Sequence, residues 1–224
     1  MECFNIDNYL EKLILRCKDS FGDRLVYVGL QGSWLRGEAT ENSDIDVMIV
    51  LDGFSVEDMK IYRDILKEIG WYEKSCGFIC GKEELTNWNP LESLQLKYTT
   101  KDLLGKLESL LPPAIRQDEI NYIKISLGNF YHEICHRYIH AGQEKSRDKL
   151  RASSKQLYFI IQNLHYLESG DFLLKKSDLK AAVPAEDCEI LCIPELPDDY
   201  DFEKTYEAVI TWCQKAFLRL SINS

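Results

Sequence analysis

Two hydrophobic patterns alternate along the first hundred residues. Apolar residues three or four positions apart predict helices over residues 6–17 and 56–69, and Ser55 followed by Asp58 resembles a capping box at the start of the second. Short apolar runs predict strands over 25–30, 45–51 and 74–80, and a further strand over 94–99. Strands that alternate with helices indicate a layered α/β domain.

The pattern changes after Pro112-Pro113, where long helical stripes replace the strands. Apolar residues at helical spacing cover 120–138, 157–167 and 206–220, which is typical of a helical bundle. Because proline ends helices and stiffens linkers, we place the boundary at the diproline. The expected domains are residues 1–111, α/β, and residues 114–224, α-helical.

The composition and net charge exclude two classes of binding partner. The 224 residues carry a net charge of −10, with 45% hydrophobic and 29% charged residues, as in a globular protein. Such a surface repels phosphate backbones, so neither nucleic acid nor an anionic membrane is an expected partner. No apolar run approaches the roughly 20 residues of a membrane span, and the acidic N-terminus does not resemble a signal peptide. We therefore expect a cytoplasmic protein whose eight cysteines are thiols.

The candidate chemistry lies between the first two strands. Gly32-Ser33 follows the strand at 25–30, and glycine lets a backbone approach a ligand closely. Asp44 and Asp46 stand two positions apart at the start of the next strand, so strand alternation puts both carboxylates on one face. Two neighbouring carboxylates repel unless a cation lies between them, and Mg²⁺ is commonly bound through a few carboxylates and substrate phosphates.

This order of strand, Gly-Ser, helix, Asp-x-Asp and strand resembles the signature of the polymerase-β-like nucleotidyltransferase superfamily. A domain of that kind, with a small mixed sheet (α/β or α+β), followed by a helical acceptor-binding domain is similar to the plan of aminoglycoside nucleotidyltransferases. In the second half, residues 164–170 and 175–179 look like the helical domain of streptomycin/spectinomycin adenylyltransferases.

The resemblance implies a function and a role for each residue. Asp44 and Asp46 would be catalytic and hold Mg²⁺, while Gly32, Ser33 and Arg36 would contact the nucleotide. The donor would be a nucleoside triphosphate, most often ATP, and its nucleoside monophosphate would pass to a hydroxyl of a small-molecule acceptor. We expect the enzyme to act as a monomer or homodimer. Arg36 has an alternative role as a surface cation paired with Glu38 or Glu41.

Family members usually add a third carboxylate from a later strand, as metal ligand or general base. The strand expected at 94–99 contains neither Asp nor Glu. Glu84, which follows the strand at 74–80, is the first candidate for this catalytic role, and Glu83 and Glu92 are the alternatives.

An acidic stretch bears on the charge of the acceptor. Residues 186–203 hold eight acids and no Lys or Arg. A solvated loop with two prolines explains such a run, and so does a surface that attracts a cationic acceptor such as an aminoglycoside-like amino sugar.

Two other functions compete with nucleotidyl transfer. Residues 132–136 match H-E-x-x-H, so His132, His136 and His140 could share one helix face as zinc ligands of a hydrolase. The segment also fits an ordinary amphipathic bundle helix. A non-catalytic protein that binds a nucleotide or a partner, of the toxin–antitoxin type, is the second alternative. Two Cys-x-x-x-Cys pairs, at 76/80 and 188/192, give only a weak zinc signal.

Overall fold

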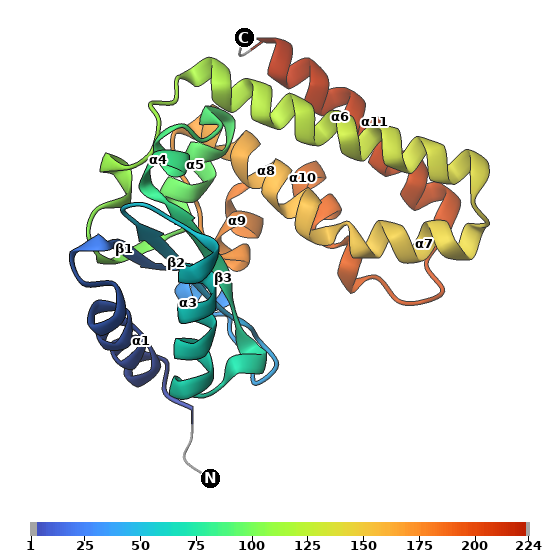
Figure 1. Ribbon diagram of the computed structural model, residues 1–224. Coiled ribbons are helices and arrows are strands. Elements are labelled where there is room, and N and C mark those ends of the chain that lie inside the picture. The colour runs from blue at the N-terminus through green and yellow to red at the C-terminus, as the bar shows by residue number, and fades with distance from the viewer. Residues whose placement is uncertain (1–3, 223–224) are drawn as a thin grey trace. The chain divides into compact units, whose positions relative to one another are not determined.

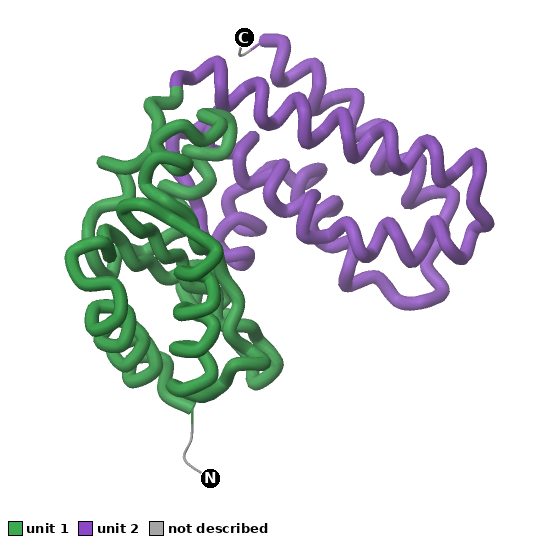
Figure 2. The backbone as a smooth tube through the Cα atoms, viewed as in Figure 1, with its two compact units in different colours: residues 1–114 green, residues 115–224 purple. Residues whose placement is uncertain are grey.

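The computed structural model describes residues 4–222 (Figure 1). The chain divides into two compact units, residues 1–114 and 115–224 (Figure 2), and the division falls directly after Pro112-Pro113-Ala114.

A four-stranded mixed sheet organises the first unit. Its strands are β1 (Leu25–Leu30), β2 (Ile45–Leu51), β3 (Ser75–Gly81) and β4 (Lys101–Leu104), in the order β3-β2-β1-β4. β1 runs antiparallel to both β2 and β4, whereas β2 and β3 are parallel. The α+β domain with a small mixed sheet is therefore confirmed.

Two helices cover one face of this sheet. α1 (Ile6–Phe21) and α3 (Val56–Ile69) lie side by side in Figure 1 and share a core with the odd-numbered residues of β2. Those residues, Ile45, Val47, Ile49 and Leu51, are all at most 1% exposed. The even-numbered residues of β2 consequently face the other side, where Met48 and Val50 belong to a second cluster.

The second face is covered by short elements after β3. These are α4 (Lys82–Thr86), α5 (Pro90–Tyr98) and the 3₁₀ turn η3 (Leu107–Ser109). The predicted strand at 94–99 is wrong, because Asn89 caps a helix that begins with Pro90. Its Oδ1 accepts a hydrogen bond from Leu91 N–H at 3.1 Å, and the fourth strand comes later, as β4.

The second unit consists of helices and connecting turns. They are α6 (Arg116–His140), α7 (Gln143–Ala152), α8 (Ser154–Ser169), α9 (Lys176–Ala182), α10 (Ala185–Leu191), the turn η4 (Ile193–Glu195) and α11 (Phe202–Ile222). The three long stripes of the sequence correspond to α6, α8 and α11, which enclose one core. Two further 3₁₀ turns, η1 (Gly22–Arg24) and η2 (Tyr72–Lys74), belong to the first unit.

A buried carboxylate ties three helices of the second unit together. Asp187 of α10 is 1% exposed and accepts hydrogen bonds from Trp212 Nε1 at 2.7 Å and from Arg219 at 2.8 and 3.0 Å. Arg219 also forms a two-point ion pair with Glu168 of α8, at 2.7 and 2.8 Å. Because the charge is paired and bonded on all sides, its burial is tolerated.

No helix among residues 4–222 has the length and apolar character that crossing a membrane requires.

Asp58 generates a prediction about acid stability. This buried carboxylate binds Arg24 and caps α3 through the Ser55 hydroxyl, 2.8 Å away, and backbone N–H, 2.9 Å away. The Arg24 guanidinium, together with these bonds, lowers the pKa of Asp58 below its usual value. Its contribution to stability is thus complete above the unfolded pKa of about 3.9 and is lost as the pH falls through the folded pKa.

We expect Asp58→Asn to lower the free energy of unfolding by about 1–2 kcal/mol at neutral pH, since the half-exposed Arg24 screens part of the ion pair. Urea unfolding of both proteins at about pH 7 and about pH 3 measures this, and the difference should shrink at the acidic pH. An equal difference at both pH values would contradict the role of the charge.

Candidate functional site

The turn after β1 brings backbone against β2. β1 ends at Leu30, and the short helix α2 (Gly32–Arg36) begins two residues later. Gln31 N–H donates to the backbone oxygen of Asp46 at 2.9 Å, and the Gln31 amide donates to the Thr100 hydroxyl at 2.8 Å. These bonds fix the Gly-Ser turn beside the first residues of β2.

Gly32 is required at this turn for two reasons. Its φ of 68° lies in the left-handed region, which favours glycine. A Cβ at this position would also lie 1.9 Å from Oδ2 of Asp46 and 2.8 Å from Cγ of that residue. The Asp46 carboxylate therefore packs directly against the Gly32 backbone.

The two carboxylates of the Asp-x-Asp motif stand at the start of β2. Asp44 is exposed and precedes the strand, and Asp46 is half-buried as its second residue. Ile45 and Val47, the residues that alternate with them, are 1% exposed in the core. Strand alternation thus places both carboxylates on the face away from α1 and α3. The structure brings Asp46 into contact with Gly32, while Asp44 lies two positions before Asp46 and Ser33 follows Gly32 in α2.

Cys76 is a neighbour that the sequence reasoning missed. It is the β3 residue paired with Asp46 in the parallel ladder. Burial and the negative charge of Asp46 raise the pKa of its thiol, which is hydrogen-bonded to that carboxylate. The signal was available, because a strand–helix–strand segment of this length usually gives adjacent parallel strands whose starts lie side by side.

The structure does not bring Glu84 to these carboxylates. It belongs to α4, and its Oε2 lies 1.9 Å from where a Cβ of Gly81 would be. Gly81 pairs with Leu51, five residues beyond Asp46, which is roughly 17 Å along the strand.

The two alternatives lie on α4 and α5. Glu92, on α5, accepts a hydrogen bond from Trp88 Nε1 at 2.6 Å, and Glu83 is an exposed residue of α4.

β4 supplies a different carboxylate, Asp102, on the same face as Asp46. It pairs with Gly29, which in turn pairs with Met48. Asp102 accepts hydrogen bonds from the Tyr27 hydroxyl at 2.9 Å and from Leu107 N–H at 3.3 Å. Burial raises the pKa of Asp102, but these bonds and the ammonium group of Lys106, 3.4 Å away, outweigh it and leave the pKa below its usual value. The side chain thus fastens the turn after β4.

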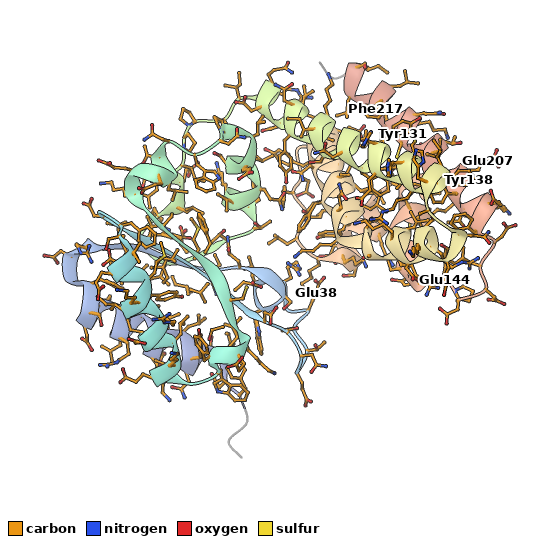
Figure 3. The ribbon with its side chains drawn as sticks, turned by 45° about the vertical axis from the view of Figure 1, so that its right-hand side comes forward. Glu38, Tyr131, Tyr138, Glu144, Glu207 and Phe217 are labelled. Carbon is orange, nitrogen blue, oxygen red and sulfur yellow. The ribbon has the colours of Figure 1, made fainter. Side chains whose placement is uncertain are left out.

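Arg36 is partly neutralised. Its Nε donates to Glu38 at 2.7 Å, and both side chains are about one-third exposed or less (Glu38 is labelled in Figure 3). The pairing with Glu38 considered from the sequence is therefore present, and any contact of Arg36 with phosphate competes with it.

The H-E-x-x-H segment lies on α6. The rings of His132, His136 and His140 follow one another at 6.3 and 4.7 Å between centroids. Glu133, however, is held by Lys149 at 3.0 Å and Arg137 at 3.2 Å, and Lys149 above all keeps the pKa of this carboxyl low. No group of three potential metal ligands occurs within residues 4–222. The segment has the character of an ordinary bundle helix.

Half of the acids in the stretch 186–203 are paired within the second unit. Four of its eight acids form ion pairs, namely Glu186 with Lys215, Asp187 with Arg219, Glu195 with Lys180 and Asp198 with Arg151. The segment therefore presents far less uncompensated charge than its sequence indicates.

Comparisons with known proteins agree with this geometry. The family described as "Nucleotidyltransferase domain" matches residues 10–123, just over half of the chain. A protein of Methanocaldococcus jannaschii named "Putative protein adenylyltransferase MJ1305" is 35% identical over 66 residues. That match covers 28% of this chain and 45% of the relative, so the chain spans less than half of the relative's length.

A solved structure shares the fold over both units. The spectinomycin adenyltransferase AAD(9) from Enterococcus faecialis, determined with ATP and spectinomycin, is similar with a TM-score of 0.57 at 16% identity. The match covers 97% of this chain and 100% of that one. Given the Gly-Ser turn packed on an Asp-x-Asp strand and the family match over 10–123, the chain belongs to the nucleotidyltransferase domain family.

Proposed function

We propose that this nucleotidyltransferase is magnesium-dependent and transfers AMP from ATP to a hydroxyl of a small-molecule acceptor. The observation that carries the proposal is the Asp46 carboxylate packed against Gly32, with Asp44 two positions before it on the same strand face. This arrangement puts two oxygen ligands next to backbone that can approach a phosphate closely.

The residues fit a hard divalent cation. Asp44 and Asp46 are carboxylates, and neither forms an ion pair with Lys or Arg among residues 4–222. Gly32, which has no Cβ, lets the Asp46 carboxylate lie directly against the turn where phosphate oxygens could approach. Both would hold Mg²⁺ together with phosphate oxygens of the substrate. When bound, the cation supplies neutralisation of the charge that develops on the transferred phosphoryl group.

The chain's own residues orient the reaction. Gly32 and Ser33 contact the triphosphate. Arg36 adds a positive charge, which the ion pair with Glu38 partly neutralises. The acceptor oxygen forms a bond to the α-phosphorus, the bond from that phosphorus to the bridging oxygen breaks, and pyrophosphate leaves with the electron pair. The acceptor proton is released to solvent, so the products are the adenylylated acceptor, pyrophosphate and a proton.

A small-molecule acceptor is favoured by the likeness over both units to an adenyltransferase that was determined with spectinomycin. The name of the relative from Methanocaldococcus jannaschii favours instead a protein acceptor. Incubation with Mg²⁺, ATP labelled at the α-phosphate and an acceptor library distinguishes the two by mass spectrometry. An AMP adduct on a small molecule supports the proposal, whereas label found only on protein overturns the choice of acceptor.

The metal site is tested by Asp46→Asn. We expect transfer to fall by about a hundredfold or more, because the charged ligand supports stabilisation of the transition state. The fold should persist, since Asn has the same shape and the like-charge repulsion with Asp44 falls. Asp52→Asn, on an exposed residue just after β2, is the matched control and should keep full activity. Undiminished turnover of Asp46→Asn would remove Asp46 from the site.

The close approach at Gly32 is tested against a second glycine. Gly37 has a similar φ of 70°, but a Cβ there would meet nothing within 4 Å. Gly32→Ala and Gly37→Ala should each lower the free energy of unfolding by about 1–2 kcal/mol through backbone strain. Only Gly32→Ala should also weaken Mg²⁺-dependent ATP binding in calorimetry, by about tenfold or more, because its methyl group displaces Asp46. Equal binding by the two variants would show that the contact has no role in the site.

A further inference from the structure

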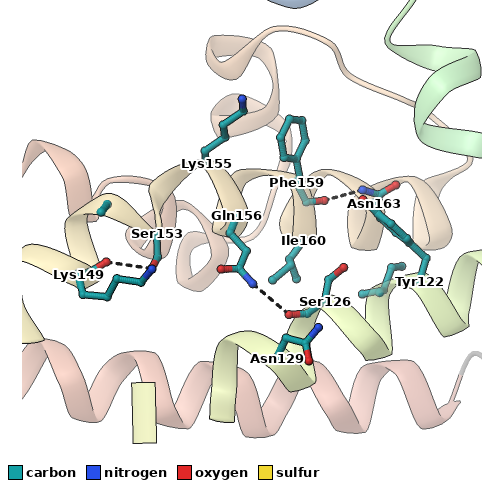
Figure 4. A pocket seen from close by; sticks show the side chains of 12 residues that line it. Tyr122, Ser126, Asn129, Lys149, Ser153, Lys155, Gln156, Phe159, Ile160 and Asn163 are labelled. Atoms are coloured by element: carbon teal, nitrogen blue, oxygen red, sulfur yellow. Dashed lines mark hydrogen bonds between the residues drawn. The ribbon is translucent and has the colours of Figure 1, made fainter. Parts of the chain in front are cut away.

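Two pockets of the helical unit have similar size and opposite charge. Each encloses about 430 Å³, in the range of small-molecule sites. The first, between α6, α7 and α8, has Lys149 and Lys155 among its twelve lining residues and no carboxylate (Figure 4). The second, here called the α6–α11 pocket, is lined by Cys135, Tyr138 and Ile139 of α6 and by Glu203, Tyr206 and Glu207 of α11. It contains two carboxylates and no basic residue.

Aromatic rings form one wall of the α6–α11 pocket. Tyr138 stacks parallel to Phe202 at 6.2 Å between centroids and lies tilted against Tyr206 at 5.0 Å. Tyr206 is anchored, because it is 4% exposed and its hydroxyl donates to Ile134 O at 2.6 Å. Tyr138 remains 47% exposed. Tyr206 is therefore fixed in place, and the neighbouring Tyr138 is the ring that a ligand can reach.

Two carboxylates stand beside these rings. Glu203 and Glu207 are four residues apart on α11 and so share one helix face; Figure 3 shows Glu207 next to Tyr138. Glu203 accepts a hydrogen bond from the Tyr138 hydroxyl at 2.6 Å. Neither carboxylate takes part in the ion pairs of residues 4–222, which engage four acids of the preceding segment. Their negative charge is thus available to a ligand.

We propose that the α6–α11 pocket binds an organic cation, an amine or quaternary ammonium group carried on an apolar body. The accessible Tyr138 ring attracts a cation through its quadrupole, the carboxylates supply opposite charge, and Ile139 contacts the apolar part. The carboxylates repel an anion, and a neutral apolar molecule brings no positive charge to compensate them. The site lies wholly within residues 115–224 and does not rest on the proposed nucleotidyl transfer.

A matched pair of probes tests the charge requirement on the full chain. The (4-hydroxyphenyl)trimethylammonium cation and 4-tert-butylphenol have nearly the same shape and differ in one positive charge. Binding is measured for each by calorimetry and by ligand-observed NMR, without nucleotide and at low salt. We expect the cation to bind at least about tenfold more tightly than its neutral analogue, and this preference should weaken as ionic strength rises.

Substitutions locate the binding. Glu203→Gln and Glu207→Gln should each lower the affinity for the cationic probe by about two- to fivefold. The double variant should bind the cationic and the neutral probe equally well. Tyr138→Phe keeps the ring and should retain most of the affinity, whereas Tyr138→Ala should lose it. Glu144→Gln on α7 and Lys155→Gln in the first pocket are controls expected to bind as the parent does.

Three results would overturn the proposal. The first is equal binding of the charged and neutral probes, and the second is a loss of affinity in the controls as large as in the Glu203 and Glu207 variants. The third is dimerisation: the measured mass of the protein doubles as its concentration rises, and replacement of Tyr138 prevents this. The last would show that a second copy of the chain covers this pocket, whose Ile139 side chain is 71% exposed.

Discussion

The contact between the Asp46 carboxylate and the Gly32 backbone is the constraint on which the candidate site depends. With a Cβ position 1.9 Å from a carboxylate oxygen, no other L-residue fits at position 32 while Asp46 keeps its place. The bond from Gln31 N–H to Asp46 O holds the turn at that distance. Antiparallel pairing of β1 with β2 then sets the end of one strand beside the start of the other. The order of elements thus places the Gly-Ser turn beside the start of β2, where the two carboxylates stand.

The parallel pairing of β2 with β3 decides what else reaches this point. It places Cys76 beside Asp46 and carries Glu84 to the far end of the ladder. Asp102, although on the same face, is committed to Tyr27 and the turn at Leu107. In the part of the chain that the structure describes, the sheet neighbours of Asp46 are therefore Gln31 and a thiol rather than a third acid. The carboxylates that lie against the Gly-Ser turn are thus those of the Asp-x-Asp pair, and the proposed metal site depends on both of them.

Local signals predicted the parts of the fold that local chemistry determines. The strands at 25–30 and 45–51 agree with β1 and β2, and the capping box at Ser55 and Asp58 is present. The predicted strand at 94–99 is wrong because Asn89-Pro90 starts a helix, and this signal outweighs the apolar alternation of the residues that follow. The Asp-x-Asp pair was recognisable because its two members are neighbours in sequence. The distance between Glu84 and this pair could not be recognised in the same way, because it depends on strand register, which no local pattern encodes.

The ion pairing of the acidic stretch 186–203 is a second property that the local sequence does not predict. Along the chain, residues 186–203 read as eight uncompensated acids, yet their cations arrive from α7, α9 and α11, far away in sequence. Pairing within the unit leaves much of that run unable to attract a distant ligand. Of the acids outside these ion pairs, Glu203 lines the α6–α11 pocket together with Glu207, which follows the run, and both lie beside aromatic rings. Because local charge, and not the total, determines which ligand a cavity accepts, the two carboxylates of the α6–α11 pocket say more about its ligand than the net charge of the chain does.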